Sequence, residues 1–562
     1  MRPSAYALLV VFGLGCAGPG SREPRVATPP PAAATKTSSP PPHFEGLGRH
    51  ARKVTTKSTE TQRYFDQGVA FMSAFNHDEA ERAFLRAAEL DPSCVMVHWG
   101  VAMANGPHIN NPEVDASHAK TAWAALGRAR AAAVGGVTKV EKDLVDALGK
   151  RYADPQPADR KALDVAYATA MRAVYEAHRD DVDVAVWFVE ALMDLRPWDY
   201  WTSDGKPQPG TDEIVTVLEA ALKKDAQHAL ANHLYIHLVE ASSAPEKADA
   251  AADRLRDLAP GLGHLVHMPS HIDIRRGRWA QAIVTNEKAI AADARYVKLS
   301  PKQGFYNLYM GHNWHMLAFA AMMLGQSEKA LAAIRAMVDG VDPEWARENA
   351  MFADGLLAMP VEVLMRFGRW QEILAAPEPP AYFPLSRALR HYARGVAYAA
   401  EGDATKARAE HSALREATPK IPKDAKFGNN TALAVAGIAE SVLTGEIAAR
   451  EGKMDAAITA LREAVRREDA LLYDEPPDWV QPVRHALGAT LIRAGKAAEA
   501  EAVYREDLKR NAENGWSLFG LERALRMQKK TDEAKVIAAR FTKAWESADV
   551  KLSSSCFCLP GI

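Results

Sequence analysis

Histidines are the residues in this chain whose spacing points most directly to chemistry. Seven of the 18 histidines fall within residues 233–315, in pairs three or four residues apart. Side chains at those spacings lie on one face of a helix, roughly 5–6 Å apart at Cβ, so each pair can clamp one metal ion. Neutral imidazole suits zinc, copper, iron and nickel. The pattern predicts a transition-metal site formed by His233, His237, His264, His267, His271, His312 and His315.

Three further residues are candidates for the same site. His98 and His108 lie earlier in the chain and can join only if it curves back. Glu240 follows His237 by three residues and is the nearest carboxylate, either as a ligand or as a catalytic proton acceptor. Clustered all-histidine ligation favours copper or iron and oxidative chemistry. Zinc-type hydrolysis comes next, and it needs an acid such as Glu240 beside a bound water.

The histidines also have a simpler interpretation. A single helical histidine such as His98 is usually a hydrogen-bonded core residue, and seven together can line a polar groove that binds a peptide or an envelope protein. Many imidazoles in one groove repel each other once protonated near pH 6, which favours a metal ion over that alternative. Whether the protein is an enzyme or a non-catalytic scaffold stays open.

The elements that must position these residues are helices. From residue 60 onward apolar residues recur at intervals of three and four, and no sustained alternating pattern predicts a strand. Within residues 61–94, repeat positions 4, 8, 11, 20, 24, 27 and 32 are occupied by Tyr64, Gly68, Phe71, Ala80, Phe84, Ala87 and Pro92. This pattern resembles the tetratricopeptide repeat (TPR) family. The resemblance implies an all-α, right-handed superhelical solenoid of antiparallel helix pairs over residues 44–550.

The small residue at repeat position 20 recurs along the chain. Ala248 and Ala282 are 34 residues apart, as are Ala500 and Ala534, whereas Ala330 follows Ala282 by 48, one repeat plus a 14-residue insertion. Residues 100–220 fit the repeat poorly. In the TPR family, positions 2, 5 and 9 of the first helix face the concave groove. The seven histidines occupy those positions in three consecutive repeats, so we expect a histidine-lined groove around residues 233–315.

A second resemblance extends beyond the repeat itself. The chain is similar to a group of exported bacterial TPR proteins with no settled activity. The likeness rests on the segments 233–237 (HLYIH), 263–271 (GHLVHMPSH), 197–201 (PWDYW), 474–477 (DEPP) and 514–521 (NGWSLFGL).

The N-terminal residues predict export. Arg2 precedes a short apolar run that is too short to span a membrane, and its end, Leu14-Gly15-Cys16, resembles a lipobox. We therefore expect residues 1–16 to be a secretory signal and lipidated Cys16 to anchor the protein in the periplasm or cell envelope, with cleavage and release as the alternative. Residues 17–43 are rich in proline and alanine and predict a disordered tether. A formal net charge of −2 argues against nucleic acid as a partner.

Several local features leave their roles open. Pro269 either kinks the helix that carries His267 and His271 or marks its first turn. The aromatic loop 196–210 either covers the groove or packs beneath it, and Asp474-Glu475-Pro476-Pro477 is most simply a turn. Residues 551–562 predict a flexible tail whose Cys556-x-Cys558 offers thiolates to copper(I) or zinc, or forms a small disulfide.

Overall fold

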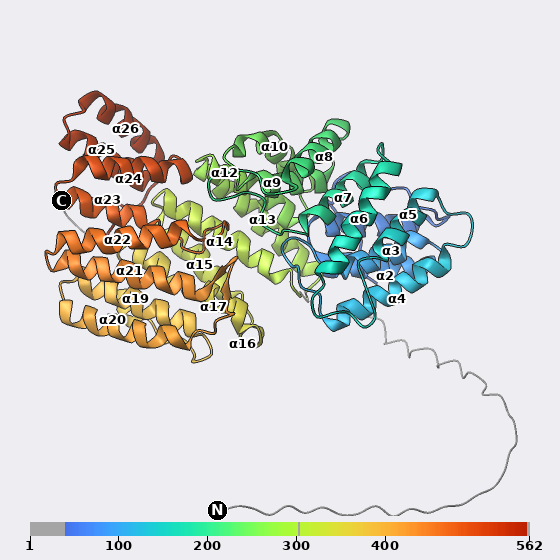
Figure 1. Ribbon diagram of the computed structural model, residues 1–562, viewed down its shortest axis with the longest axis horizontal. Helices are drawn as coiled ribbons and strands as arrows, with labels where there is room; N and C mark the ends of the chain where they lie inside the picture. The colour runs from blue at the N-terminus through green and yellow to red at the C-terminus, as the bar shows by residue number, and fades with distance from the viewer. Residues whose placement is uncertain (1–39, 302–303, 559–562) are drawn as a thin grey trace, which may run out of the picture. The chain divides into compact units, whose positions relative to one another are not determined.

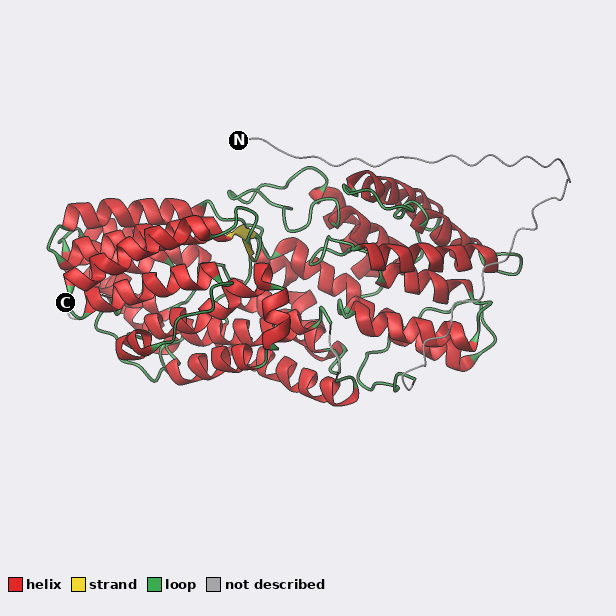
Figure 2. Ribbon diagram, turned by 90° about the horizontal axis from the view of Figure 1, so that it is seen from below, coloured by secondary structure: helices red, strands yellow, loops and turns green. Residues whose placement is uncertain are grey.

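The computed structural model describes residues 40–301 and 304–558, and almost every element in them is an α-helix. The exceptions among these residues are two short 3-10 helices and one hairpin of two-residue strands, β1 (Lys426–Phe427) and β2 (Asn430–Thr431), drawn in yellow in Figure 2. The predicted signal, Cys16 and most of the tether lie outside the described residues. The prediction of an all-α fold is confirmed.

The first two helices show how the repeat forms. Ser58 caps α1 (Thr59–Ser73) and Asn76 caps α2 (His77–Leu90), each side chain accepting a backbone N–H of the first turn. The Phe84 ring fills the space between helices, and a Cβ added at Gly68 or Gly100 would lie 2.5 Å from it. These glycines are 32 residues apart in sequence, and their lack of a side chain allows close helix packing. This small–large complementarity is that of a TPR-type solenoid.

The remaining helices of the N-terminal half follow in the order of the chain (Figure 1). They are α3 (Val95–Ala104), α4 (Ala116–Ala132), α5 (Lys139–Leu148), α6 (Lys161–Ala177), α7 (Val182–Met193), α8 (Thr211–Lys224), α9 (Ala229–Val239), η1 (Pro245–Ala248), α10 (Asp249–Leu258), α11 (Gly263–His267), α12 (Pro269–Arg275) and α13 (Trp279–Leu299). The connections 105–115, 149–160 and 194–210 are long, which explains the poor fit of residues 100–220 to a 34-residue repeat. The predicted insertion lies in the extended α13 and the segment that follows it.

The C-terminal half continues the stack. Its elements are α14 (Asn307–Met323), α15 (Ser327–Asp339), α16 (Pro343–Glu348), α17 (Ala350–Arg366), α18 (Trp370–Ala375), α19 (Pro384–Ala400), α20 (Ala404–Ala417), η2 (Thr418–Lys420), α21 (Ala432–Arg450), α22 (Met454–Asp469), α23 (Val483–Arg493), α24 (Ala497–Arg510), α25 (Gly515–Met527) and α26 (Thr531–Ala544). Among the described residues α21 alone has the length and apolar composition of a membrane span. However, 61% of its apolar stretch is buried inside the protein, as in a core helix.

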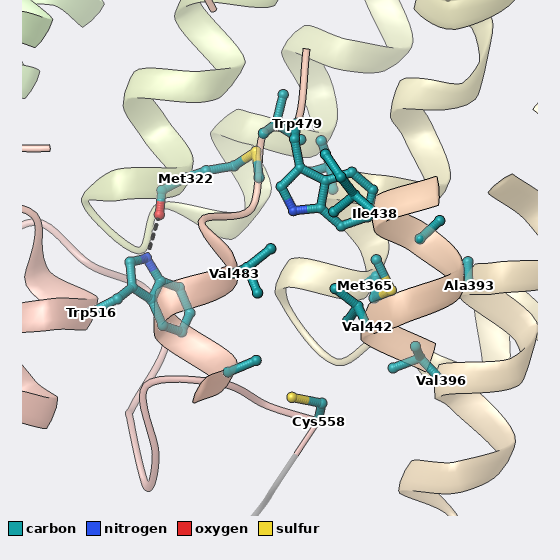
Figure 3. Close-up of a cluster of buried hydrophobic side chains, with 14 of the residues drawn as sticks. Met322, Met365, Ala393, Val396, Ile438, Val442, Trp479, Val483, Trp516 and Cys558 are labelled. Carbon is teal, nitrogen blue, oxygen red and sulfur yellow. Dashed lines mark hydrogen bonds between the residues drawn. The ribbon is translucent and has the colours of Figure 1, made fainter. Parts of the chain in front are cut away.

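The end of the chain packs back onto earlier helices. Trp516 on α25 donates its indole N–H to the carbonyl of Met322 on α14 at 2.8 Å, beside the apolar cluster shown in Figure 3. Ser555 is buried and hydrogen-bonds the Tyr504 hydroxyl at 2.6 Å. Residues 551–558 therefore form a strap on the helices rather than the free tail that their serine-rich sequence suggested, because the helices satisfy the polar groups of the strap.

The close approach of Phe84 to Gly100 generates a stability prediction. We expect Gly100→Ala to lower the free energy of unfolding by about 1–3 kcal/mol, because the new methyl group overlaps the Phe84 ring. Gly127→Ala is the matched control: it lies in helix α4 with no atom within 4 Å of the new Cβ, so helix propensity predicts a neutral or stabilising effect. Urea denaturation measures both, and equal effects would contradict the packing argument.

Candidate metal centre

Four helices bring the histidines together. His233 and His237 lie on α9, His264 and His267 on α11, His271 on α12, and His312 on α14. Pro269 is the first residue of α12, so it starts a new helix after Met268. The break leaves the His267–His271 pair intact, because their Nε2 atoms are 2.8 Å apart.

The histidines form two adjacent groups of three. In each group the ligand atoms lie within 4.8 Å of one another. Ring centroids across the groups are 5.3 Å apart for His237 and His271, and 5.7 Å apart for His264 and His267. We call the groups the His233 triad (His233, His237, His264) and the His267 triad (His267, His271, His312).

Hydrogen-bond acceptors fix the Nδ1 side of four of these rings. His233 Nδ1 donates to the backbone carbonyl of Ser73 at 2.8 Å. Glu240 accepts from His237 Nδ1 at 2.8 Å through Oε1 and from His271 Nδ1 at 2.6 Å through Oε2. An acceptor at Nδ1 places the proton there and leaves Nε2 with its lone pair, the arrangement typical of histidine metal ligands.

The fourth ring completes the pattern. His267 Nδ1 lies 2.7 Å from Asn286 Oδ1, and the Asn286 amide nitrogen donates to the carbonyl of Ala282, which orients the side chain. Because His267 and His271 both carry their protons on Nδ1, their Nε2 lone pairs face each other across 2.8 Å. Two facing lone pairs repel unless a metal ion or an extra proton lies between them.

Burial favours the neutral, metal-binding form of His233, His264 and His267. The five histidines on α9, α11 and α12 are at most 2% exposed, and only His312 is partly exposed. Burial, reinforced by neighbouring imidazoles, lowers the pKa of His233, His264 and His267 well below the usual value. Burial alone would raise the pKa of Glu240, but His271 and His237 lower it to about 2, so it is a carboxylate.

The structure rearranges the other predicted candidates. His315 is buried on α14 but belongs to neither triad, and burial lowers its pKa to about 4. His98 points away, with Nε2 2.9 Å from the carbonyl of Pro92. His108 lies at the edge of the cluster, with its ring 4.6 Å from that of Phe75. Both carboxylate oxygens of Glu240 accept hydrogen bonds from the rings of His237 and His271. Glu240 is therefore placed to orient these two rings.

The site also differs from the expected open groove. Trp198 from the 196–210 loop covers His237 edge-on at 5.0 Å, and Phe75 packs on His233 at 4.3 Å. In the same loop Tyr200 is buried and Trp201 donates to the carbonyl of Leu238. The aromatic loop therefore both covers the site and packs beneath the surface. Aromatic side chains from two connections cover the His233 triad, whereas the His267 triad keeps a partly exposed member in His312.

Sequence reasoning missed Phe75 and His77. Phe75 adopts φ 54° in the α1–α2 turn, whereas the corresponding turns after α12, α14, α17, α19, α21 and α23 have glycine at positive φ. A phenylalanine there is strained by roughly 1–2 kcal/mol, so its packing on the histidines must offset the strain. The His77 ring packs at a tilt against the His108 ring, with centroids 4.4 Å apart. The sequence signal for Phe75 is a bulky residue at the turn position that glycine occupies in the other turns named above.

Comparisons with known proteins identify no family for this chain. No protein-family model matches the chain, and a search of curated proteins finds no significant match. Among solved structures, the human IFIT1 dimer with m7Gppp-AAAA shares 12% identity over 87% of this chain and 91% of that one, with a TM-score of 0.33. Ypp1 shares 9% over 89% and 88%, with a TM-score of 0.42, and APC/C Cut9–Hcn1 shares 12% over 88% and 78%, with a TM-score of 0.33. At these scores we draw no functional argument from them.

A buried aspartate supports the helix that carries His264. Asp293 on α13 accepts hydrogen bonds from the Tyr306 hydroxyl at 3.2 Å and from the Asn313 amide at 2.7 Å. The Tyr306 oxygen in turn accepts the backbone N–H of His264. A Cβ at Gly263 would lie 1.9 Å from the Asp293 carboxylate, so glycine is required where α11 begins.

This network predicts a pH effect. Burial raises the pKa of Asp293 from 3.8 to about 7. Between those values the folded protein holds a proton that the unfolded chain has released, so stability falls as pH rises through this window. We expect Asp293→Asn to reduce that fall by a few kcal/mol, measured by urea denaturation at pH 5 and pH 7.5. The exposed Asp532→Asn is the control, and an unchanged pH dependence in Asp293→Asn would contradict the assignment.

Proposed function

We propose that this protein is an exported, lipid-anchored TPR-type protein whose two histidine triads bind transition-metal ions, one ion in each triad. The observation that carries the proposal is the 2.8 Å approach of the His267 and His271 Nε2 atoms, whose Nδ1 atoms both face acceptors. A cation between them removes the repulsion and uses both lone pairs. The export signal and Cys16 anchor are proposed from the sequence alone.

The position of Glu240, more than the donor set, ranks copper or iron chemistry above zinc hydrolysis. All six ligands are imidazoles, which suit copper and iron as well as zinc. Zinc hydrolysis also needs a carboxylate beside a bound water, but both oxygens of Glu240 accept imidazole N–H groups. Copper or iron bound here would supply one-electron redox chemistry. Burial in the chain favours neutral His233, His264 and His267, the acceptors Ser73, Glu240 and Asn286 fix tautomers, and Phe75 and Trp198 cover the His233 triad.

A peptide-binding scaffold is the alternative function, and a TPR-type fold is compatible with it. The burial of the histidines argues against their serving as its contact surface, because side chains at most 2% exposed offer a peptide no edge to bind. A metal ion is small enough to enter such a site, and the partly exposed His312 gives the His267 triad an open side.

Elemental analysis tests the proposal directly. The full chain, purified from a periplasm without an affinity tag, is expected to contain up to two equivalents of copper, iron or zinc. His267→Ala/His271→Ala should lose the ion of the His267 triad while circular dichroism shows an intact helical fold. His98→Ala is the matched control, because His98 is buried but bound to the carbonyl of Pro92. No metal in the wild-type chain after reconstitution would refute the metal function and favour the scaffold.

The shared carboxylate gives a second prediction. Glu240→Gln keeps the shape of the side chain but offers one acceptor and one donor, so only one of His237 and His271 can keep its proton on Nδ1. We expect about 10–100-fold weaker metal binding with unchanged stoichiometry at saturation. Competition titration against a chelator measures the affinity. Affinity equal to wild type would contradict the positioning role of Glu240.

A further inference from the structure

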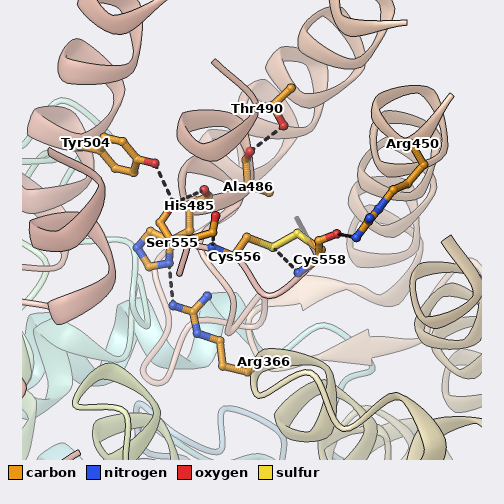
Figure 4. Close-up of a disulfide and its surroundings, with 10 residues drawn as sticks. Arg366, Arg450, His485, Ala486, Thr490, Tyr504, Ser555, Cys556 and Cys558 are labelled. Carbon is orange, nitrogen blue, oxygen red and sulfur yellow. Dashed lines mark hydrogen bonds between the residues drawn. A yellow bond between two sulfur atoms is a disulfide. The ribbon is translucent and has the colours of Figure 1, made fainter. Parts of the chain in front are cut away.

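The disulfide between Cys556 and Cys558 does not have the form of a structural staple. Only one residue separates the two cysteines, and both lie in the C-terminal strap (Figure 4). Disulfides stabilise proteins mainly by closing long loops in the unfolded chain, and the effect grows with loop length. A loop this short restricts the unfolded chain little, and the bond does not tie the strap to any helix. Because the bond is a poor staple, with Cys558 buried and Cys556 partly exposed, it points to chemistry at the sulfurs.

A buried carboxylate lies beside these sulfurs. Ligand atoms of Glu446, Cys556 and Cys558 lie within 4.8 Å of one another. Glu446 on α21 is 2% exposed, its Oε1 has no hydrogen-bond partner, and burial raises its pKa to about 7. These three residues, with Val442 and Trp479, line a cavity of about 30 Å³. An orphaned carboxylate oxygen facing a cavity of that size leaves room for one small ion or water.

Other contacts hold the strap in place independently of the disulfide. Ser555 hydrogen-bonds the Tyr504 hydroxyl and the carbonyl of His485, and Arg450 donates to the carbonyl of Cys558 (Figure 4). Both ring nitrogens of His485 are engaged, Nδ1 by Arg366 and Nε2 by Asp507, each at 3.0 Å. The available donors at the cavity are therefore two sulfurs and one carboxylate.

We propose that Cys556, Cys558 and Glu446 form a redox-controlled zinc site, closed by the disulfide when oxidised and binding one Zn²⁺ when reduced. Zinc accepts thiolate and carboxylate ligands together, whereas a carboxylate is a poor ligand for copper(I). A dithiol reductant transfers two electrons and two protons to the disulfide and itself becomes a disulfide. The partly exposed Cys556 is the sulfur that the reductant attacks. Zinc binding then releases both thiol protons. The site is separate from the histidine triads and does not depend on their metal.

Cobalt(II) is the probe, because thiolate ligands give it a near-ultraviolet charge-transfer band that imidazoles do not. The full chain is reduced with a phosphine, which becomes phosphine oxide as water supplies its oxygen and the two thiol protons. After anaerobic gel filtration, cobalt titration is expected to develop the band with one equivalent, and zinc should displace it. The oxidised chain should show no band, even where cobalt occupies the histidines. Absence of the band in the reduced wild type would overturn the proposal.

Two variants test the ligands. Cys556→Ser/Cys558→Ser retains Cys16 and Cys94 and should lose the band, whereas Cys94→Ser should keep it. Glu446→Gln keeps both thiols and the shape of the cavity, and we expect it to bind cobalt at least about tenfold more weakly. Unchanged affinity in Glu446→Gln, or a persistent band in the double serine variant, would refute the site as proposed. Because the band reports thiolates alone, neither result depends on the histidine centre.

Discussion

Two imidazole N–H groups share one buried carboxylate, and the arrangement of the histidine centre depends on that interaction. Glu240 is fully buried, and a carboxylate in such a place is costly unless hydrogen bonds compensate its lost hydration. His237 and His271 provide two, one to each oxygen. The same bonds fix both tautomers and turn both Nε2 atoms away from Glu240, one toward each triad. A single side chain thus aligns α9 with α12 and couples the two groups of ligands.

The rest of the cluster is held by segments far apart in sequence. His233 is fixed by the carbonyl of Ser73, 160 residues away, at the end of α1. The next residues of that connection bring Phe75 over the triad in a conformation that glycine adopts in other turns of the stack. The repeat supplies the spacing of the helices, and exceptions to the repeat supply the walls of the site. Local departures from a regular pattern are expected where function opposes stability.

The two candidate metal sites of this chain differ in donor chemistry. The triads offer imidazoles that are buried except for His312, and the Glu240 carboxylate beside them would offset part of the charge of a bound cation. The strap offers two thiolates and a carboxylate next to Arg450, and it is available only after reduction. The soft thiolates are thereby kept apart from the borderline imidazoles, so that one chain offers separate sets of donors to different ions.

The sequence by itself determined the fold class and most members of the histidine cluster. Helical periodicity is a local property, and residues three and four apart share a face wherever the helix packs, so His233 with His237 and His267 with His271 could be paired in advance. The repeat positions also placed three helices side by side. Sequence could not decide the partners outside those helices: that His312 and not His315 completes a triad, that His98 faces Pro92, and that Glu240 accepts hydrogen bonds from two imidazoles. Those choices, like the docking of residues 551–558, depend on which distant backbone and side-chain groups satisfy each buried polar atom, and only the tertiary structure brings those groups together.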